Sequence, residues 1–402
     1  MVRDLRLRPE VELVPTPRHA SVLLVAGSFL PGQVPGLAQV HDQIPLPRAT
    51  VRWRSDGGEE VPRARQVDGD EDDLVATLVA LHRELLVDPS RAESPVLPDV
   101  DPVEWRGVGP YGHGGKGMTG GTPYGRPLAE RADDRDGLTL DQLPVSIGPW
   151  VGALPPGLRL RVKLQGDLIQ EVEVGSPVAA AEQSADVFSR AIREPVSVAE
   201  LELERARHHL RWLADALLVQ GLAALGRRAL RLARSLTPQH QREAERLLTM
   251  VRRSGVFTLA LNRAGGEVTG SAAAGLGPVA RASGLSEDAR LNEPGYRALG
   301  FKAILHRDGD VAARWRQRMA EVVQSLELCA RAGDRTAFGG GWVEAPRGRT
   351  TADGRSPSVS LLDRLPDLLP GLEWGDGVAT IWSLDIDPMV GVGAAADVRG
   401  EP

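Results

Sequence analysis

Residues 275–333 read GLGPVARASGLSEDARLNEPGYRALGFKAILHRDGDVAARWRQRMAEVVQSLELCARAG, and this stretch decides the fold that we expect. Its second half predicts a long helix between an N-cap at Asp310 and a C-cap at Gly333. Apolar residues recur there at helical spacing and form a stripe on one face: Val311, Trp315, Met319, Val322, Leu326 and Cys329. Arg314, Arg318 and Glu321 are expected beside or opposite that stripe.

The first half of the stretch is rich in glycine, proline and small residues that carry charged side chains at irregular spacing. In chain order it contains GPVARASG, D-x-R and P-x-Y, then G-D-x3-R-x3-R-x2-E-x3-S. This order of motifs resembles the large-subunit family that comprises the 49 kDa-type quinone-site subunit of respiratory complex I and the large subunits of nickel–iron hydrogenases. The resemblance implies an α+β fold, mainly a helical bundle of hydrogenase-large-subunit type with a peripheral β hairpin or sheet.

Two further segments match motifs of this family. Residues 202–210 match E-L-E-R-x3-H-L, and residues 344–348 match E-x-P-R-G. The residues that the resemblance assigns to the family's cleft are Glu202, Arg205, His209, Arg281, Asp288, Arg290, Glu344 and Arg347. For the last five of these, two interpretations stay open: buried salt bridges that join loops, or the lining of a quinone or small-anion cleft. Glu202 and Arg205 also have the spacing of a surface pair, and His209 also fits a hydrogen-bonded histidine at the edge of a core.

Several ligand positions of the family hold other residues here. Where the family has two histidines, this chain has Val151 and Pro155, and the first of those histidines is the quinone-head hydrogen-bond donor of the family. Where hydrogenases have two cysteines, this chain has Met389 and Val392. The single cysteine, Cys329, cannot alone supply the thiolates of an iron–sulfur or nickel–iron centre. We therefore expect no metal site and no cofactor bound by this chain, and we keep quinone as the candidate ligand.

Residues 17–53 resemble part of the small iron–sulfur subunit that partners the large subunit in these complexes. The apolar run over residues 20–26 ends at Gly27, which indicates a buried parallel strand followed by a turn. Because the cysteines of the family's terminal cluster are missing, we interpret residues 1–90 as a truncated, flavodoxin-like α/β segment. A Pro/Gly-rich linker is expected over residues 91–140, and a large-subunit-like domain over residues 141–402.

Residues 106–136 form a glycine-rich tract in which the triplet PYG occurs twice. A phosphate loop is excluded, because position 110 is proline where a glycine is needed and neither Ser nor Thr follows Lys116 directly. Three interpretations stay open: a loop ordered against a neighbouring protein, a ligand-covering loop, or a disordered linker. The ligand-covering loop would use His113, Lys116, Tyr124 and Arg126.

Other segments carry local patterns. Alternating apolar residues over 158–174, around Gln165-Gly166-Asp167, predict a β-hairpin. Residues 196–233 predict one helix, and Thr237-Pro238 begins another that runs to Arg253. The apolar runs at 257–261 and 378–384 are strand candidates.

Composition limits the class of protein. The 402 residues are 42% hydrophobic and 25% charged, as in ordinary globular proteins. A formal charge of −6 without a concentrated basic stripe argues against a nucleic-acid partner. Since there is no apolar run long enough to span a bilayer and no signal-peptide core, we expect a cytoplasmic location, peripheral on the cytoplasmic face of a membrane complex.

The resulting hypothesis is a degenerate, cofactor-less large subunit of a complex related to NADH:quinone oxidoreductase or membrane-bound hydrogenase. It would dock and couple to ion-translocating membrane subunits, and catalysis by this chain alone is not expected. The implied partners are a small iron–sulfur-type subunit, or its replacement, and antiporter-like membrane subunits. The alternative is a quinone-binding redox subunit that receives electrons from a partner chain. The resemblance then implies an NADH dehydrogenase-like oxidoreductase with quinone and NAD binding.

Overall fold

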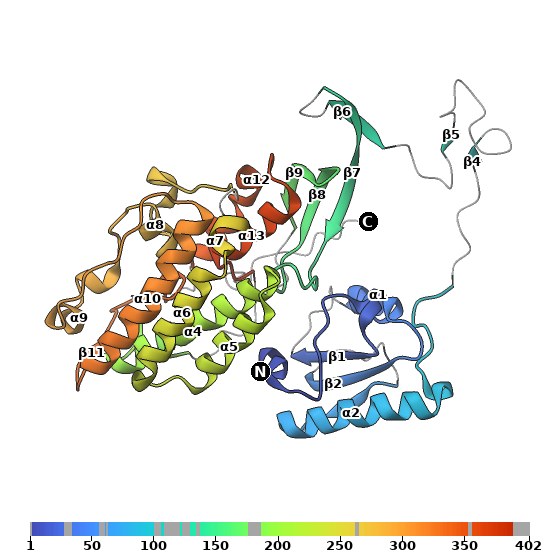
Figure 1. Cartoon of the computed structure of the whole chain (residues 1–402), viewed down its shortest axis with the longest axis horizontal. Helices are drawn as coiled ribbons and strands as arrows, with labels where there is room; N and C mark the ends of the chain where they lie inside the picture. Colours follow the sequence, from blue (N-terminus) through green and yellow to red (C-terminus); the bar gives the residue numbers. More distant parts are fainter. Residues whose placement is uncertain are drawn as a thin grey trace. The chain divides into compact units, whose positions relative to one another are not determined.

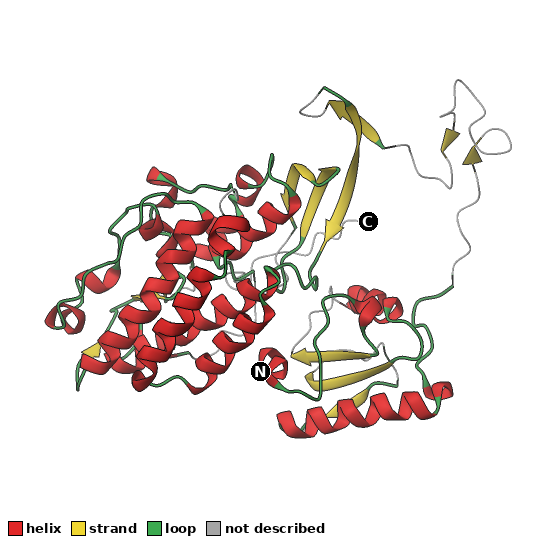
Figure 2. Cartoon of the chain, viewed as in Figure 1, coloured by secondary structure: helices red, strands yellow, loops and turns green. Residues whose placement is uncertain are grey.

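The computed structural model describes residues 2–27, 34–55, 61, 63–99, 106–107, 121–122, 129–133, 137–175, 186–261, 265–352 and 356–388. The chain forms two compact units. We call residues 1–16, 147–161 and 172–402 the helical unit, and residues 17–146 and 162–171 the N-terminal unit. Most helices belong to the helical unit (Figure 2).

A three-stranded parallel sheet of order β1-β2-β3 lies in the N-terminal unit. The elements around this sheet are η2 (Pro17–His19), β1 (Val22–Gly27), α1 (Val34–Gln43), β2 (Ala49–Ser55), β3 (Arg65–Val67), α2 (Glu71–Val87) and η4 (Pro89–Arg91). The predicted parallel strand is therefore confirmed as β1, which pairs with β2 from Val22 opposite Ala49 onward. Of its residues only Val25 is fully buried, so the strand is less enclosed than its apolar run suggested.

The predicted β-hairpin is also confirmed. It consists of β8 (Leu160–Gln165) and β9 (Leu168–Val174), with Gly166 at φ 63° in the turn. These strands belong to a four-stranded sheet of order β6-β7-β8-β9, in which β6 spans Glu130–Asp133 and β7 spans Thr139–Ile147. A separate two-stranded ladder joins β4 (Arg106–Gly107) to β5 (Gly121–Thr122).

The core of the helical unit lies between four long helices that pack side by side (Figure 1). They are α4 (Val198–Val219), α5 (Ala223–Ser235), α6 (Gln241–Arg253) and α10 (Val311–Arg331). Leucines from these helices surround Trp212 and Trp315, whose rings meet edge to face at 5.3 Å between centroids. Burying each large apolar side chain contributes roughly 1.5–3 kcal/mol, so this core supplies much of the stability of the unit.

Short helices and small ladders complete the helical unit. They are η1 (Val2–Leu7), α3 (Val187–Ala191), β10 (Val196–Ser197), η6 (Pro238–His240), α7 (Val256–Leu259), η7 (Gly270–Ala273), α8 (Pro278–Ala282), η8 (Ala289–Leu291), α9 (Pro294–Ala298), β11 (Thr336–Ala337), β12 (Trp342–Ala345), β13 (Gly348–Thr351), α11 (Pro357–Leu362), α12 (Leu365–Leu368) and α13 (Trp374–Leu384). β10 pairs with β11, and β12 forms an antiparallel hairpin with β13. Several of these elements carry the buried polar residues described below.

Helix α10 confirms the prediction made from residues 310–333. Asp310 is the N-cap and accepts a hydrogen bond from the Ala313 amide at 2.6 Å. The C-cap is Ala332, and Gly333, expected as the C-cap, lies one residue beyond it with φ 55°. The apolar stripe is buried as expected. Arg314, Arg318 and Glu321 are each 1% exposed, because loops cover the face that a simple amphipathic helix would leave to solvent.

Three local predictions were wrong. The single helix expected over 196–233 is two helices, because Gly221 adopts φ 76° and ends α4. The strand candidates at 257–261 and 378–384 are the helices α7 and α13. Short apolar runs do not distinguish a strand from a buried helix, and α13 is buried from Gly377 to its end at Leu384.

The α+β class is confirmed, while the hydrogenase-type bundle, the flavodoxin-like topology and the division at residues 90 and 140 stay predictions. The set of four long helices and the small parallel sheet are the elements to which those predictions refer. No helix in the described part of the chain combines the length and apolar character needed to cross a membrane.

Replacing the N-cap of α10 tests how far this helix depends on its first turn. Asp310→Ala removes the acceptor for the Ala313 amide, and we expect a loss of about 1 kcal/mol in the free energy of unfolding, measured with urea. Asp308→Ala, at an exposed position two residues earlier, is the control and should leave the unfolding midpoint unchanged. Equal effects of the two substitutions would contradict the capping role.

Candidate functional site

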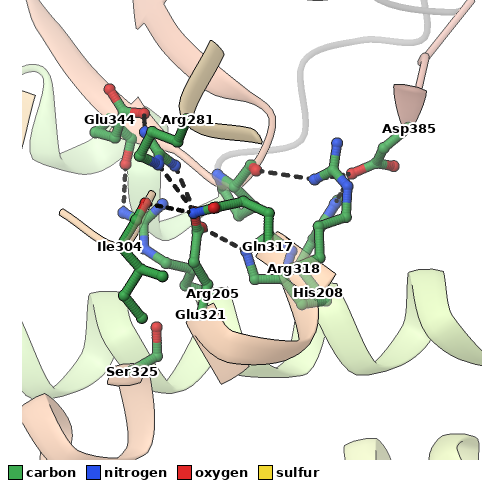
Figure 3. Close-up of polar contacts among 12 residues, drawn as sticks. Arg205, His208, Arg281, Ile304, Gln317, Arg318, Glu321, Ser325, Glu344 and Asp385 are labelled. Carbon is green, nitrogen blue, oxygen red and sulfur yellow. Dashed lines mark hydrogen bonds and ion pairs between the residues drawn. The ribbon is translucent and has the colours of Figure 1, made fainter. Parts of the chain in front are cut away.

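A network of buried charged side chains occupies the polar centre of the helical unit, and Figure 3 shows part of it. It draws residues from α4, α8, the η8 turn, α9, α10 and β12. We call it the central network, and its members are Glu202, Arg205, His209, Arg281, Asp288, Arg290, Tyr296, Glu321, Ser325 and Glu344. Every member is less than 9% exposed, so each charge has to be neutralised by neighbours.

Arg281, on α8, contacts three carboxylates. Its Nε and Nη2 donate to the two oxygens of Glu321 at 2.9 and 3.2 Å, a bidentate pair. Its Nη1 donates to Glu344 Oε1 at 2.7 Å and lies 3.0 Å from Asp288 Oδ2. Burial alone would lower the pKa of Arg281, but these carboxylates outweigh it and hold the pKa above its ordinary value. The guanidinium therefore stays charged.

Arg290 and Glu202 form the other half of the central network. Arg290 makes a bidentate pair with Asp288 at 2.7 and 3.0 Å and reaches both oxygens of Glu202 at 3.3 Å. Glu202 also accepts from Tyr296 Oη at 2.7 Å and from Ser325 Oγ at 2.6 Å. Burial would raise the pKa of Glu202, yet the charges of Arg205 and Arg290 and these hydroxyls lower it overall. This carboxylate is ionised and fully bonded.

His209 differs from its neighbours because neither ring nitrogen makes a hydrogen bond to the described residues. Its Nε2 lies 3.3 Å from Glu321 Oε2, but the orientation does not form a hydrogen bond. Burial lowers the pKa of His209 from 6.5 to about 4, so the ring is neutral at pH 7. Burial opposes ionisation of Glu321 as well, but the charge of Arg281 holds the pKa of Glu321 well below its ordinary value.

A second cluster surrounds Asp385, which follows α13 in a left-handed conformation at φ 54°. Its carboxylate lies 2.8 Å from His208 Nε2, 3.2 Å from Arg318 Nη1 and 3.4 Å from Arg347 Nε. Burial raises the pKa of Asp385, but the charges of Arg347, His208 and Arg318 outweigh it and hold the pKa far below the ordinary value. Figure 3 shows Arg318 directed toward Asp385 and Glu321 toward Arg281.

Two glycines allow the loops to carry these side chains inward. Gly277, just before α8, has φ 56°, and Gly348, at the start of β13, has φ 125°. A Cβ at Gly277 would lie 2.3 Å from the Gly348 Cα, so the two backbones touch. This contact brings the segment that carries Arg281 against the turn that carries Glu344 and Arg347.

The structure brings seven of the eight sequence-predicted cleft residues together in the central network. Arg347 lies in the second cluster instead, where its Nε donates to the main-chain oxygen of Asp385 at 2.9 Å. The simple surface pairing considered for Glu202 and Arg205 is wrong: the pair exists, at 3.1 Å, but both side chains are buried. His209 is buried, but among the described residues it lacks the hydrogen bonds that a satisfied core-edge histidine would have. His113, Lys116, Tyr124 and Arg126 lie outside the described residues.

Sequence reasoning did not select Arg318, Glu321, His208 or Asp385 as site residues. A signal was present for α10, because Arg314, Arg318, Glu321 and Ser325 recur at spacings of four, three and four and so share one helical face. Nothing in the sequence indicated Asp385, whose role depends on the left-handed turn after α13.

Within the described ranges, no group of three or more His, Cys, Asp or Glu side chains is placed to hold a metal ion.

These observations define an α+β protein with a mainly helical unit built around a closed network of arginines and carboxylates. Residues 228–351 match the family described as the 49 kDa subunit of respiratory-chain NADH dehydrogenase. Over this segment, which contains Arg281, Asp288, Arg290, Glu321 and Glu344, the chain is similar to the 49 kDa-type large-subunit family.

Individual relatives show the same similarity. The chain is 32% identical over 143 residues to the D-type subunit of NADH-quinone oxidoreductase from Desulfotalea psychrophila, an alignment that covers 27% of this chain and 38% of the relative. It is 43% identical over 72 residues to a D-type subunit of the NADH-quinone oxidoreductase from Salinispora tropica, covering 17% and 16% of the two chains. The chain thus spans well under half the length of these curated relatives.

One solved structure is also similar in part. It is a chain of the membrane-bound sulfane sulfur reductase, described as an archaeal respiratory membrane complex. The TM-score is 0.47 at 17% sequence identity, and the superposition covers 62% of this chain and 97% of the other.

Removing the central arginine should destabilise the helical unit strongly. Arg281→Met leaves Glu321, Asp288 and Glu344 buried without their shared partner, and we expect a loss of about 3–5 kcal/mol in the free energy of unfolding. Arg190→Met, which breaks an exposed pair with Glu200, is the matched control and should barely change the urea midpoint. Similar midpoints for the two variants would refute the importance of the central network.

His209 should make stability depend on pH. Its pKa is lowered in the folded protein, so its contribution is present above pH 6.5 and is lost as the pH falls through 6.5 toward about 4. The difference between the two pKa values corresponds to roughly 3 kcal/mol across that window. Urea unfolding at pH 7, 6 and 5 should show a smaller pH slope for His209→Asn than for the parent. His19→Asn, at an exposed position, is the control, and an unchanged slope for His209→Asn would count against this assignment.

Proposed function

We propose that this chain is a cofactor-less large subunit of a membrane-associated complex related to NADH:quinone oxidoreductase. It contacts neighbouring subunits at the cytoplasmic face of the membrane and couples them mechanically. The family match over residues 228–351 supports the class of complex. The observation that carries the non-redox role is the central network, in which the chain's own groups already bond the charged residues of the family motifs, His209 being the exception.

The pairing within the central network supports this role. Each of the carboxylates of Glu202, Asp288, Glu321 and Glu344 contacts at least one arginine of the chain. A group whose hydrogen-bonding capacity is filled internally stabilises the fold, whereas a ligand site keeps donors or acceptors free for the ligand. The residues of the family motifs thus hold loops in place.

The same network gives the unit the rigidity that coupling needs. Arg281 and Arg290 tie α8 and the η8 turn to both long helices, through Glu321 on α10 and Glu202 on α4. Displacing one of these loops would separate charges in a low-dielectric interior, which is costly. Movement of one neighbouring subunit would therefore be passed on by the whole helical unit. By the family resemblance, those neighbours are a small iron–sulfur-type subunit, or its replacement, and antiporter-like membrane subunits.

Purification of the tagged chain from detergent-solubilised membranes of its own cells tests the subunit role. We expect it to migrate on native gels with membrane subunits of an NADH:quinone oxidoreductase-type complex, identified by mass spectrometry. Metal analysis of the isolated chain should give no stoichiometric iron or nickel. Recovery of the chain as a free monomer, with no membrane subunit in the purified material, would refute the proposal.

Redox measurements on the purified complex test the non-redox part separately. We expect that any quinone-dependent signal persists in a complex that contains Arg281→Lys, which keeps a positive charge among the three carboxylates. Arg190→Lys on the surface of the same unit is the control. Loss of the quinone signal in the assembled Arg281→Lys complex alone would show that this chain takes part in electron transfer.

A further inference from the structure

Helices α5 and α6 carry a strongly basic surface, although the formal charge of the whole chain is −6. Residues 223–253 contain eight arginines and two acidic residues, Glu243 and Glu245. All of the arginines are exposed, and we call them the basic surface: Arg227, Arg228, Arg231 and Arg234 on α5, and Arg242, Arg246, Arg252 and Arg253 on α6. The sequence-based expectation of no concentrated basic stripe was therefore wrong, because the whole-chain charge conceals this local excess.

The arginines share one surface across the seam between the two helices. α5 and α6 pack side by side and are joined by residues 236–240 (Figure 1). Arg228 Nη1 lies 3.7 Å from the sulfur of Met250 on α6. Arg246 and Arg253 lie four residues before and three residues after Met250, so they flank that contact on the same face of α6. The opposite faces of both helices carry leucines and alanines that are buried in the apolar core.

Few carboxylates lie near the basic surface. Most of its arginines form no ion pair with a described residue: Arg227, Arg228, Arg231, Arg242, Arg246, Arg252 and Arg253. Among the neighbouring elements, η1 holds Asp4, α4 holds Glu204 and α10 holds Glu327. Glu204 already pairs with Arg207 and Arg211. The helix pair therefore presents positive charge that nearby side chains leave largely uncompensated.

The other residues of the helix pair favour one class of partner. No large apolar side chain of residues 223–253 is exposed, whereas the centre of a protein–protein interface is apolar and rich in aromatic residues. The same residues include no Phe, Tyr or Trp, so they lack the rings on which single-stranded nucleic acids stack. Two helices side by side present their guanidinium groups roughly in a plane, as the phosphates of a bilayer surface are arranged.

A leucine protrudes at one end of the basic surface. Leu259, on α7, is 87% exposed. A Cβ at Gly255 would lie 3.1 Å from Leu259 Cδ1, so the leucine side chain covers the turn that follows Arg253. Peripheral proteins bind membrane surfaces with this combination, because basic side chains contact the headgroups while an apolar side chain enters the boundary between headgroups and acyl chains.

We propose that the basic surface binds the anionic phospholipid headgroups of a membrane surface. The guanidinium groups of Arg228, Arg246 and Arg253 contact the lipid phosphates, and Leu259 inserts at the boundary with the acyl chains. The attraction acts within one Debye length of the membrane, about 10 Å at roughly 0.1 M salt, so the binding is sensitive to salt. This inference does not rest on the proposed subunit role, because a free chain would bind lipid in the same way.

Cosedimentation of the full chain with lipid vesicles tests the proposal. The chain should bind vesicles of phosphatidylcholine with about one-third phosphatidylglycerol roughly tenfold more tightly than vesicles of phosphatidylcholine alone, and the binding should weaken as salt rises. Equal binding to both kinds of vesicle would overturn the proposal, and so would the absence of binding to either. Tighter binding to duplex DNA than to the anionic vesicles, at the same salt concentration, would assign the surface to nucleic acid and overturn it as well.

Matched substitutions at exposed positions locate the binding. Arg246→Gln together with Arg253→Gln removes two charges beside the seam, and affinity for the anionic vesicles should fall roughly tenfold. Arg297→Gln together with Arg307→Gln removes the same charge outside the basic surface and should leave the affinity unchanged. Leu259→Ala should weaken binding severalfold without changing its salt dependence, because the inserted side chain is uncharged. If the two double variants bind equally well, the basic surface is not the site and the proposal fails; unchanged binding by Leu259→Ala would contradict the insertion.

Discussion

The bidentate ion pair between Arg281 and Glu321 is the interaction on which the helical unit depends. Both side chains are fully enclosed, at 0% and 1% exposure, so neither charge can be solvated if its partner is lost. Desolvating two such ions costs several kcal/mol each, and only close geometry with further hydrogen bonds offsets that cost. Gln317 and Glu344 supply those extra bonds, to Glu321 and Arg281 respectively.

This dependence explains how the surrounding loops are arranged. An apolar core fixes the four long helices, but apolar contacts are not directional and would allow the loops many positions. The central network is directional, because a planar guanidinium bonds carboxylates only in a few orientations. Loops from residues 277–296 and 342–348 are therefore held in one arrangement by arginines that reach the helices. The buried charges therefore select one arrangement of the loops, in addition to any stability that they contribute.

The sequence allowed the elements with strong periodicity to be predicted. The cap at Asp310, the stripe on α10 and the hairpin around Gly166 follow from local rules that involve neighbours within four residues. The strand candidate at 378–384 was wrong, because a short apolar run that is buried on all sides shows neither helical nor strand periodicity of hydrophobic residues. The candidate site residues were predicted from the order of the family motifs, not from a periodic pattern in the sequence. The partners of those residues, such as Asp385 for Arg318, depend on how distant turns meet, which no local pattern encodes.

The touching backbones at Gly277 and Gly348 have an evolutionary consequence. A side chain at either position would strain a left-handed backbone and also push the two segments apart, so the loops could not approach. A charged residue nearby can be replaced if its ionic partner is replaced as well. At Gly277 and Gly348 an added Cβ would meet the backbone of the other segment, so a change in a neighbouring side chain does not make room for it. A chain of this kind that lost either glycine would therefore be expected to have a remodelled polar interior.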